Sequence, residues 1–138
     1  MKEESLKIGA CFPKRESLIN AKLHSKTQRG MGSAKTNSGL SYINSIVISE
    51  YPDNVVLKDD LFYSGEGGFD RNNNRIIKDQ SIQTAANRYM INSINKKTKI
   101  KVFEKANCGY VFKGFYIPTH HIITRGRDRF QIIDFHLK

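Results

Sequence analysis

YPDNVVLKDDLFYSGEGGFDRNNNRIIKDQ, residues 51–80, is the stretch from which the fold and function of this chain are best inferred. It opens with a polar loop that begins at Tyr51 and contains Asp53 and Asn54. An apolar segment follows and ends at Tyr63, just before a glycine-rich turn at 64–68. A polar, basic loop then closes the stretch. Two aromatic faces, an amide and nearby cations together can hold a flat, polar-edged ligand beside a phosphate backbone.

The side chains of this stretch suit a nucleobase in particular. A tyrosine face can stack on a base, which stabilises binding by roughly 1–3 kcal/mol. Asn54 can accept and donate hydrogen bonds. Ser64 and Gly65 offer backbone N–H groups, and a glycine lets a ligand approach closely because it has no Cβ. The alternative is a glycine-rich hairpin whose tyrosines simply pack in the core, and residue types alone leave both interpretations open.

The net charge points to a polyanionic partner. The chain has 138 residues, which suits one domain. Lysine and arginine number 23 against 13 acidic residues, so the formal charge is +10 and the pI is about 9.7. Such a balance in a small domain favours nucleic acid as the partner. A charge that serves solubility, or a drift in composition, is the alternative explanation.

The two cysteines predict no metal site. Cys11 and Cys108 lie far apart, with no CxxC pair and no histidine at zinc-binding spacing. We therefore expect two reduced thiols in a cytosolic protein. The charged start, residues 1–4, predicts no signal peptide. No apolar run approaches the roughly 20 residues that cross a bilayer, so we expect no membrane partner, and no motif indicates a cofactor.

Apolar patterning predicts an α+β fold. Residues 42–49 form a β-branched run typical of a buried strand, and residues 61–63 are the centre of a second strand. A short helix is expected over 17–23 and a long loop over 24–41. The main helix is expected over 79–96, capped by Asp79 or Ser81, with an inward face made of Ile82, Ala86, Tyr89 and Ile94.

Short strands dominate the rest of the chain. Turn signals at 107–109, 113–114 and 125–128 separate them. Many short strands with few helices indicate a barrel-like or strongly curved sheet in a single domain, residues 1–138. The expected strands are 100–103, 110–112, 115–117, 121–123 and 130–135.

A catalytic interpretation has little support. His120 and His121 are adjacent, so in a strand they point to opposite faces. Neither they nor Asp134 fit a known metal or acid–base motif. We therefore predict a binding domain that is not an enzyme. A small metal-dependent nuclease built on these three residues is the enzymatic alternative.

The motifs resemble those of the SRA (SET- and RING-associated) domain, also called the YDG domain. YSGEGGFD at 63–70, followed by Asp79-Gln80, is similar to the family's Tyr-x-Gly-x-Gly-Gly-x-Asp run and its downstream Asp-Gln. The similarity runs in order from about residue 8 to the C-terminus. Further matching elements are Arg15–Leu18, Lys22–His24, Gly30-Met31, Ser45–Ser49, Lys101–Glu104 and Phe112–Tyr116.

The resemblance implies a PUA-like curved sheet or barrel flanked by a few helices, and recognition of a modified cytosine flipped out of duplex DNA. Tyr51 and Tyr63 match the family's two base-sandwiching tyrosines, and the twelve-residue spacing is kept. Asn54 stands where the family often has an aspartate that contacts the cytosine edge. The implied pocket comprises Tyr51, Asp53, Asn54, Tyr63, Ser64 and Gly65.

Two loops match the family elements that enter the DNA grooves. The first is Gln28, Arg29, Gly30 and Met31. The second includes Asn74 and Arg75. Cations in and beside these loops are assigned to phosphate contacts, which position a protein without reading sequence, although each of them alone is equally explained as a solvated surface charge. The cations assigned to phosphate contacts are Lys26, Lys35, Arg71 and Lys78.

The resulting expectation is the specificity module of a bacterial modification-dependent restriction system. Its partners would be double-stranded DNA carrying 5-methylcytosine or 5-hydroxymethylcytosine, and a nuclease domain or subunit. No cofactor is expected. The expected location is the cytoplasm, with association to the nucleoid when DNA is bound. A PUA-like RNA-binding module is the main alternative, and the metal-dependent nuclease is the other.

Overall fold

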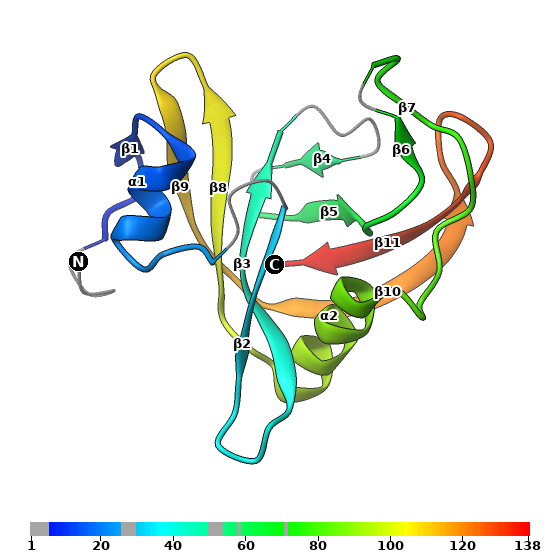
Figure 1. The fold of residues 1–138 in the computed structure, drawn as a ribbon, viewed down its shortest axis with the longest axis horizontal. Coiled ribbons are helices and arrows are strands. Elements are labelled where there is room, and N and C mark those ends of the chain that lie inside the picture. Colours follow the sequence, from blue (N-terminus) through cyan, green and yellow to red (C-terminus); the bar gives the residue numbers. More distant parts are fainter. Residues whose placement is uncertain (1–5, 26–29, 50–53, 58, 71) are drawn as a thin grey trace.

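The computed structural model describes residues 6–25, 30–49, 54–57, 59–70 and 72–138. Its strands form two open sheets and one two-stranded hairpin, accompanied by two helices (Figure 1). The five-stranded sheet has the order β1 (Cys11–Phe12), β9 (Gly109–Tyr116), β8 (Ile100–Ala106), β3 (Ser41–Ile48) and β2 (Met31–Lys35). The four-stranded sheet has the order β10 (Pro118–Arg125), β11 (Gln131–Leu137), β5 (Leu61–Ser64) and β4 (Val55–Val56). The hairpin pairs β6 (Phe69–Asp70) with β7 (Arg75–Ile76), and the helices are α1 (Arg15–Asn20) and α2 (Ala85–Lys96).

Strand β3 is the central buried strand, as its continuous apolar run predicts. It pairs in parallel with β8 and antiparallel with β2. Ile46 and Ile48 pack into the core between the sheets and α2, whereas Val47 packs into a second core beneath α1. Burial on both faces is what makes the run continuous instead of alternating.

Helix α2 is shorter than the sequence predicts. It begins after the N-cap residue Thr84, which makes no side-chain capping bond. The expected cap residue Asp79 instead accepts a hydrogen bond from the backbone of Gln131, at 2.8 Å. Ile82 precedes the helix and is 38% exposed, so its predicted place on the inward face is wrong. Asp79 and Gln80 bond to β11, and residues 81–84 form a turn before the helix instead of its first turn.

The first helix also differs in its bounds, because it begins at Arg15 and ends at Asn20. Lys22 then adopts a left-handed backbone with φ +59°. Leu18 and Leu23 are nevertheless both buried. Leu23 therefore packs in the core although it lies beyond the helix.

The predicted loop over 24–41 contains a strand. Strand β2 occupies residues 31–35 and pairs with β3 along its edge. Its sequence, Met-Gly-Ser-Ala-Lys, has no β-branched residue, so it carries no local strand signal. Pairing with β3 supplies the hydrogen bonds that residue preference does not.

Strand β9 is continuous where the sequence predicts two strands and a turn at 113–114. Val102 pairs with Gly114, and the next residue, Phe103, pairs with Phe112. Lys113 is therefore an extra residue in a β-bulge, and Gly114 there has φ +118°. A bulge accommodates the Lys-Gly pair without ending the strand.

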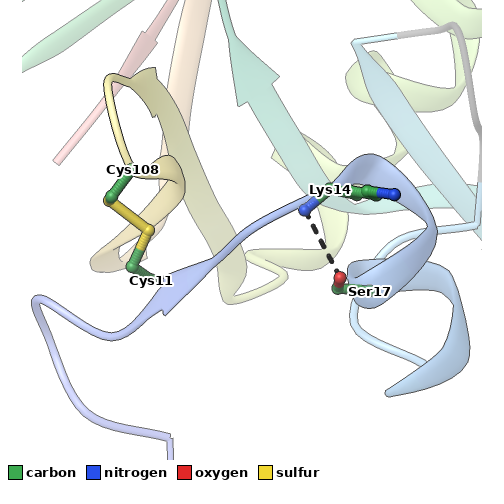
Figure 2. The surroundings of a disulfide bond; sticks show 4 residues. All are labelled: Cys11, Lys14, Ser17 and Cys108. Atoms are coloured by element: carbon green, nitrogen blue, oxygen red, sulfur yellow. Dashed lines mark hydrogen bonds between the residues drawn. A yellow bond between two sulfur atoms is a disulfide. The ribbon is translucent and has the colours of Figure 1, made fainter.

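The prediction of two reduced thiols is wrong, because Cys11 and Cys108 form a disulfide. Figure 2 shows it joining β1 to the turn between β8 and β9, beside the start of α1. Their Cα atoms are 6.5 Å apart, although 97 positions separate them in sequence. At the start of α1, the Lys14 backbone N–H donates to Ser17 Oγ. The two cysteines come together because β1 pairs with β9, and no local sequence pattern predicts that strand pairing.

The predicted fold class is confirmed: the described part of the chain is mostly β-structure with two short helices. The described strands lie in sheets that have edges, so the structure supports the curved-sheet form of the prediction and not a closed barrel. Neither helix within the described residues has the length and apolarity that crossing a membrane requires.

Candidate nucleic-acid interface

The end of strand β5 brings together several of the predicted pocket residues. The backbone N–H of Ser64 donates a 2.8 Å hydrogen bond to Asn54 Oδ1. Because a backbone N–H can only donate, the oxygen of the Asn54 amide must face Ser64 and its NH₂ group must face elsewhere. Asn54 is half-buried and precedes β4, which pairs with β5. The polar edge predicted for the pocket is thus assembled next to Tyr63.

Tyr63 lies at the boundary between the core and the loop around position 30. Its side chain is 6% exposed and belongs to the main core, as the alternative interpretation expects. Its hydroxyl is directed at the Val47 carbonyl, 3.4 Å away. A Cβ atom at Gly30 would overlap that hydroxyl. Position 30 therefore requires glycine, because the tyrosine and the predicted insertion loop are in contact there.

Two buried amides, which sequence reasoning did not assign to the site, hold the glycine-rich turn. Gln80 Nε2 donates to the carbonyls of Gly65 and Gly67, at 2.7 and 3.3 Å, and its Oε1 accepts from the Ile133 backbone. Asn87 on α2 accepts from the Glu66 N–H and donates to the Glu66 carbonyl, at 2.7 and 3.0 Å.

These bonds fix the backbone of the turn at residues 65–67. Gln80 and Asn87 are 2% and 0% exposed. A Cβ at Gly65 would lie within 3.0 Å of both amide oxygens, which accounts for glycine there. In the sequence, Gln80 is marked only by the Asp79-Gln80 pair of the family motif, which does not indicate that its side chain holds the turn.

The polar, basic loop that follows the glycine-rich turn forms the β6–β7 hairpin. Asp70 accepts hydrogen bonds from the backbone of Asn72 and from Asn73 Nδ2, at 3.0 and 2.7 Å. The bond from Asn73 lowers the pKa of Asp70 below its ordinary value. Asn74 adopts a left-handed backbone with φ +49°, and Arg75 follows it on the exposed side of the hairpin. The loop is thus a structured projection that ends in a cation.

The remaining predicted residues fall into four groups. Lys78 is exposed and lies beside the glycine-rich turn, because a Cβ at Gly68 would overlap its carbonyl. Met31 is 5% exposed and packs in the core, so its side chain supports the loop from beneath. Lys35 lies at the far end of β2 from Gly30, near the β2–β3 turn (Figure 1). Outside the described residues are Lys26, Gln28, Arg29, Tyr51, Asp53 and Arg71.

One basic segment beside the hairpin was missed by the sequence interpretation. Figure 1 shows the turn between β10 and β11 next to the segment that carries β7. The Ile76 backbone N–H donates to Asp128 Oδ2 at 2.7 Å, and Arg127 Nη2 donates to the Asn74 carbonyl at 2.6 Å. The sequence marked residues 125–128 only as a turn, because nothing local shows which loop packs against it.

The residues of the nuclease alternative do not converge. Ile122 pairs with Asp134 across β10 and β11, and strand alternation puts His120 on that same face. His121 lies on the opposite face, where its ring approaches Phe135. Within the described residues, no three histidine, cysteine or acidic side chains are arranged to hold a metal ion. The geometry gives this alternative no assembled site.

Comparison with known proteins identifies relatives of the whole domain. The SRA domain of SUVH5, solved in complex with fully methylated CG DNA, is 30% identical, with a TM-score of 0.83 over 96% of this chain and 88% of that one. The same SUVH5 domain bound to fully hydroxymethylated CG DNA matches at 27% identity, a TM-score of 0.85, and coverage of 99% and 91%.

A longer protein shares the fold. The modification-dependent restriction endonuclease TagI matches at 22% identity and a TM-score of 0.82, over 95% of this chain but 48% of TagI. No curated protein matches the sequence significantly. The family model for the SAD/SRA domain matches residues 2–138, nearly the full length. This chain therefore belongs to the SAD/SRA domain family.

Proposed function

We propose that this domain binds duplex DNA carrying 5-methylcytosine or 5-hydroxymethylcytosine and reads the base by flipping it into a pocket between Tyr51 and Tyr63. Membership of the SAD/SRA family supports this proposal. So does similarity to SUVH5 domains solved with methylated and with hydroxymethylated CG DNA. The formal charge of +10 suits a DNA partner.

The observation that carries the proposal is the assembly at the end of β5. Asn54 bonds to Ser64, Gly30 touches Tyr63, and Gln80 and Asn87 fix the turn at 65–67. Flipping a base costs a few kcal/mol, which stacking of roughly 1–3 kcal/mol per aromatic face must offset. A pocket whose backbone is already held loses little entropy on binding, so more of the stacking energy remains.

We extend the proposal to the effector. TagI has the same fold and is a modification-dependent restriction endonuclease, of which this chain covers about half. At 22% identity the likeness establishes the fold alone, so a restriction role for this chain is inferred. In this proposal the domain supplies the DNA reading, and a nuclease domain or subunit supplies the cleavage.

The proposal predicts a binding preference that depends on Tyr51. Fluorescence anisotropy at near-physiological salt would compare one duplex with cytosine, 5-methylcytosine or 5-hydroxymethylcytosine at a single position. We expect at least about tenfold tighter binding to a modified form, equivalent to about 1.4 kcal/mol. Tyr51→Ala should bind the modified duplex no better than the plain one, because one stacking face is removed.

Tyr63→Phe is the matched control, because it keeps the ring and its packing. Tyr63→Ala is unsuitable, since emptying a core aromatic site destabilises a protein by about 3–5 kcal/mol. Equal binding of all three duplexes by the parent domain would contradict the proposal. Tighter binding of a structured RNA than of any duplex, at matched salt, would favour an RNA-binding module instead.

The orientation of Asn54 predicts how base choice can be changed. Its oxygen accepts from Ser64, so its NH₂ group is the one available to donate to N3 or O2 of a flipped cytosine. Asn54→Asp keeps an acceptor for Ser64 and replaces that donor with a second acceptor, which suits the cytosine amine. We expect the ratio of affinities for 5-methylcytosine over thymine to rise about tenfold, within the range of one well-placed base contact.

The test uses 5-methylcytosine and thymine, each placed opposite guanine in the same duplex. Thymine has the same 5-methyl group but a carbonyl where cytosine has the amine. The ease of flipping a mismatched base affects both variants equally, so it cancels when their ratios are compared. An unchanged ratio would show that Asn54 does not contact the base edge.

A further inference from the structure

The turn between β10 and β11 is strongly basic. Arg125, Arg127 and Arg129 are all exposed. The one acidic residue among them, Asp128, is already engaged: its Oδ2 accepts from the Ile76 backbone, and its Oδ1 lies 3.6 Å from Arg127 Nε. The turn therefore presents its arginines to solvent while its carboxylate is used to attach it to the protein.

The turn is rigidly built. Arg125 Nη1 donates to the Arg129 carbonyl at 2.8 Å, and the Gly126 N–H donates to the Phe130 carbonyl at 3.1 Å. Arg129 has a left-handed backbone with φ +71°. An arginine in this conformation is uncommon, because glycine adopts it with less strain. The backbone at position 129 is thus fixed within the turn, and its side chain is exposed.

The turn and the β6–β7 hairpin form one unit. Besides the Asp128 contact, Arg127 bonds to the Asn74 carbonyl, and the Gln131 N–H donates to Asp79 Oδ1 at 2.8 Å. These contacts join residues 52 or 53 positions apart in sequence. The arginine turn is therefore held at a fixed position beside the hairpin.

The combined surface suits a phosphate backbone. The turn adds three arginines to Arg75 and Lys78 on the adjoining segment, and all five residues are exposed. Like charges held on neighbouring loops repel one another, and a polyanion relieves that repulsion. Guanidinium groups match phosphate oxygens especially well because their donors form a planar fork.

We propose that the turn at 125–129 is a DNA phosphate-binding element that acts together with the β6–β7 hairpin. This inference rests on the proposed function, because it assumes that the hairpin faces DNA. The turn binds the backbone beside the flipped base and does not read the base itself. It therefore contributes equally to modified and unmodified duplexes.

The test is the salt dependence of binding by an Arg125→Gln/Arg129→Gln variant. For every DNA phosphate that the protein no longer neutralises, the slope of log affinity against log salt should fall by about 0.9, so the double variant should show a slope smaller by nearly 2. Affinity for modified and plain duplexes should fall by the same factor. Arg129→Lys should keep the slope, because it keeps the charge.

The matched control is Lys7→Gln/Lys105→Gln. It removes the same charge from exposed positions near β1 and the β8–β9 turn, on the other side of the molecule in Figure 1. We expect its slope to match that of the parent. An unchanged slope in the arginine variant, or an equally reduced slope in the lysine control, would overturn the inference, provided that thermal unfolding shows all variants folded.

The outcomes separate this inference from the proposed function. If the domain does not distinguish modified bases, the slopes still report whether the turn binds DNA. If the turn does not bind DNA, the slope stays constant while the preference for a modified base persists in the arginine variant.

Discussion

Replacing Gln80 by alanine is expected to lower the free energy of unfolding by about 3 kcal/mol, because two buried backbone groups are deprived of their hydrogen-bond partner. These groups are the Ile133 N–H and the Gly65 carbonyl, at 2.9 and 2.7 Å from the Gln80 amide. For a domain of this size, the destabilisation corresponds to a fall of roughly 10 °C in the melting temperature. Thermal and urea unfolding would measure it.

The same substitution should abolish the preference for modified DNA below the melting temperature, since Gln80 holds the turn that lines the proposed pocket. Gln83→Ala is the matched control, because Gln83 is exposed and lies three residues away. Its effect should stay within about 0.5 kcal/mol. A Gln80→Ala variant with parental stability would show that the observed bonds contribute little.

The Gln80→Glu variant tests whether Gln80→Ala destabilises the domain by removing a hydrogen-bond donor or by removing side-chain volume. The introduced carboxyl can donate to the Gly65 carbonyl only when it is protonated. Burial favours that neutral form, so the folded-state pKa of the introduced group lies above its unfolded value of about 4.3. The stability of this variant relative to the parent should therefore be greatest below that pH and decline as pH rises through the folded-state pKa. A pH-independent difference would indicate a packing defect instead.

Removing the disulfide is expected to lower the free energy of unfolding by about 2–5 kcal/mol. The bond closes a long loop, with a sequence separation of 97. In the chain-entropy account, such a crosslink restricts the unfolded chain and so raises its free energy. Cys11→Ser/Cys108→Ser, or reduction of the exposed bond, should lower the melting temperature by roughly 10 °C.

DNA binding should survive this change, because the disulfide lies on the opposite side of the molecule from the β6–β7 hairpin in Figure 1. The double-serine variant is the control for the reduction experiment, since it has no disulfide and a reductant should not alter its melting temperature. If the melting temperature of the parent is equally insensitive to a reductant that fully reduces its disulfide to two thiols, the stabilisation expected from the crosslink is absent.

Much of the fold was predictable because its signals are local. The run at 42–49 predicts a buried strand from residue types alone, and the structure places β3 there with its apolar residues buried. Strands β5, β8, β10 and β11 were likewise expected near their observed positions. The glycine-rich turn after Tyr63 was recognisable because glycine permits conformations and approaches that other residues resist.

The errors share a physical cause. Strand β2 has no residues that favour a strand and exists because β3 pairs with it. The helix predicted from residue 79 begins at residue 85, because Asp79 and Gln80 bond to β11 instead. In each case an interaction distant in sequence overrides a weak local preference.

The sequence by itself determined the charge, the central strand, the glycine-rich turn and the candidate residues Asn54, Tyr63, Ser64 and Gly65. The tertiary structure alone decided which groups meet: Asn54 with Ser64, Gln80 with the turn, Cys11 with Cys108, and the arginine turn with the hairpin. Residue preferences and periodicity act within a few positions, whereas these contacts form only when loops of up to about a hundred residues close. The partner of each group is therefore set by the packing of the whole chain.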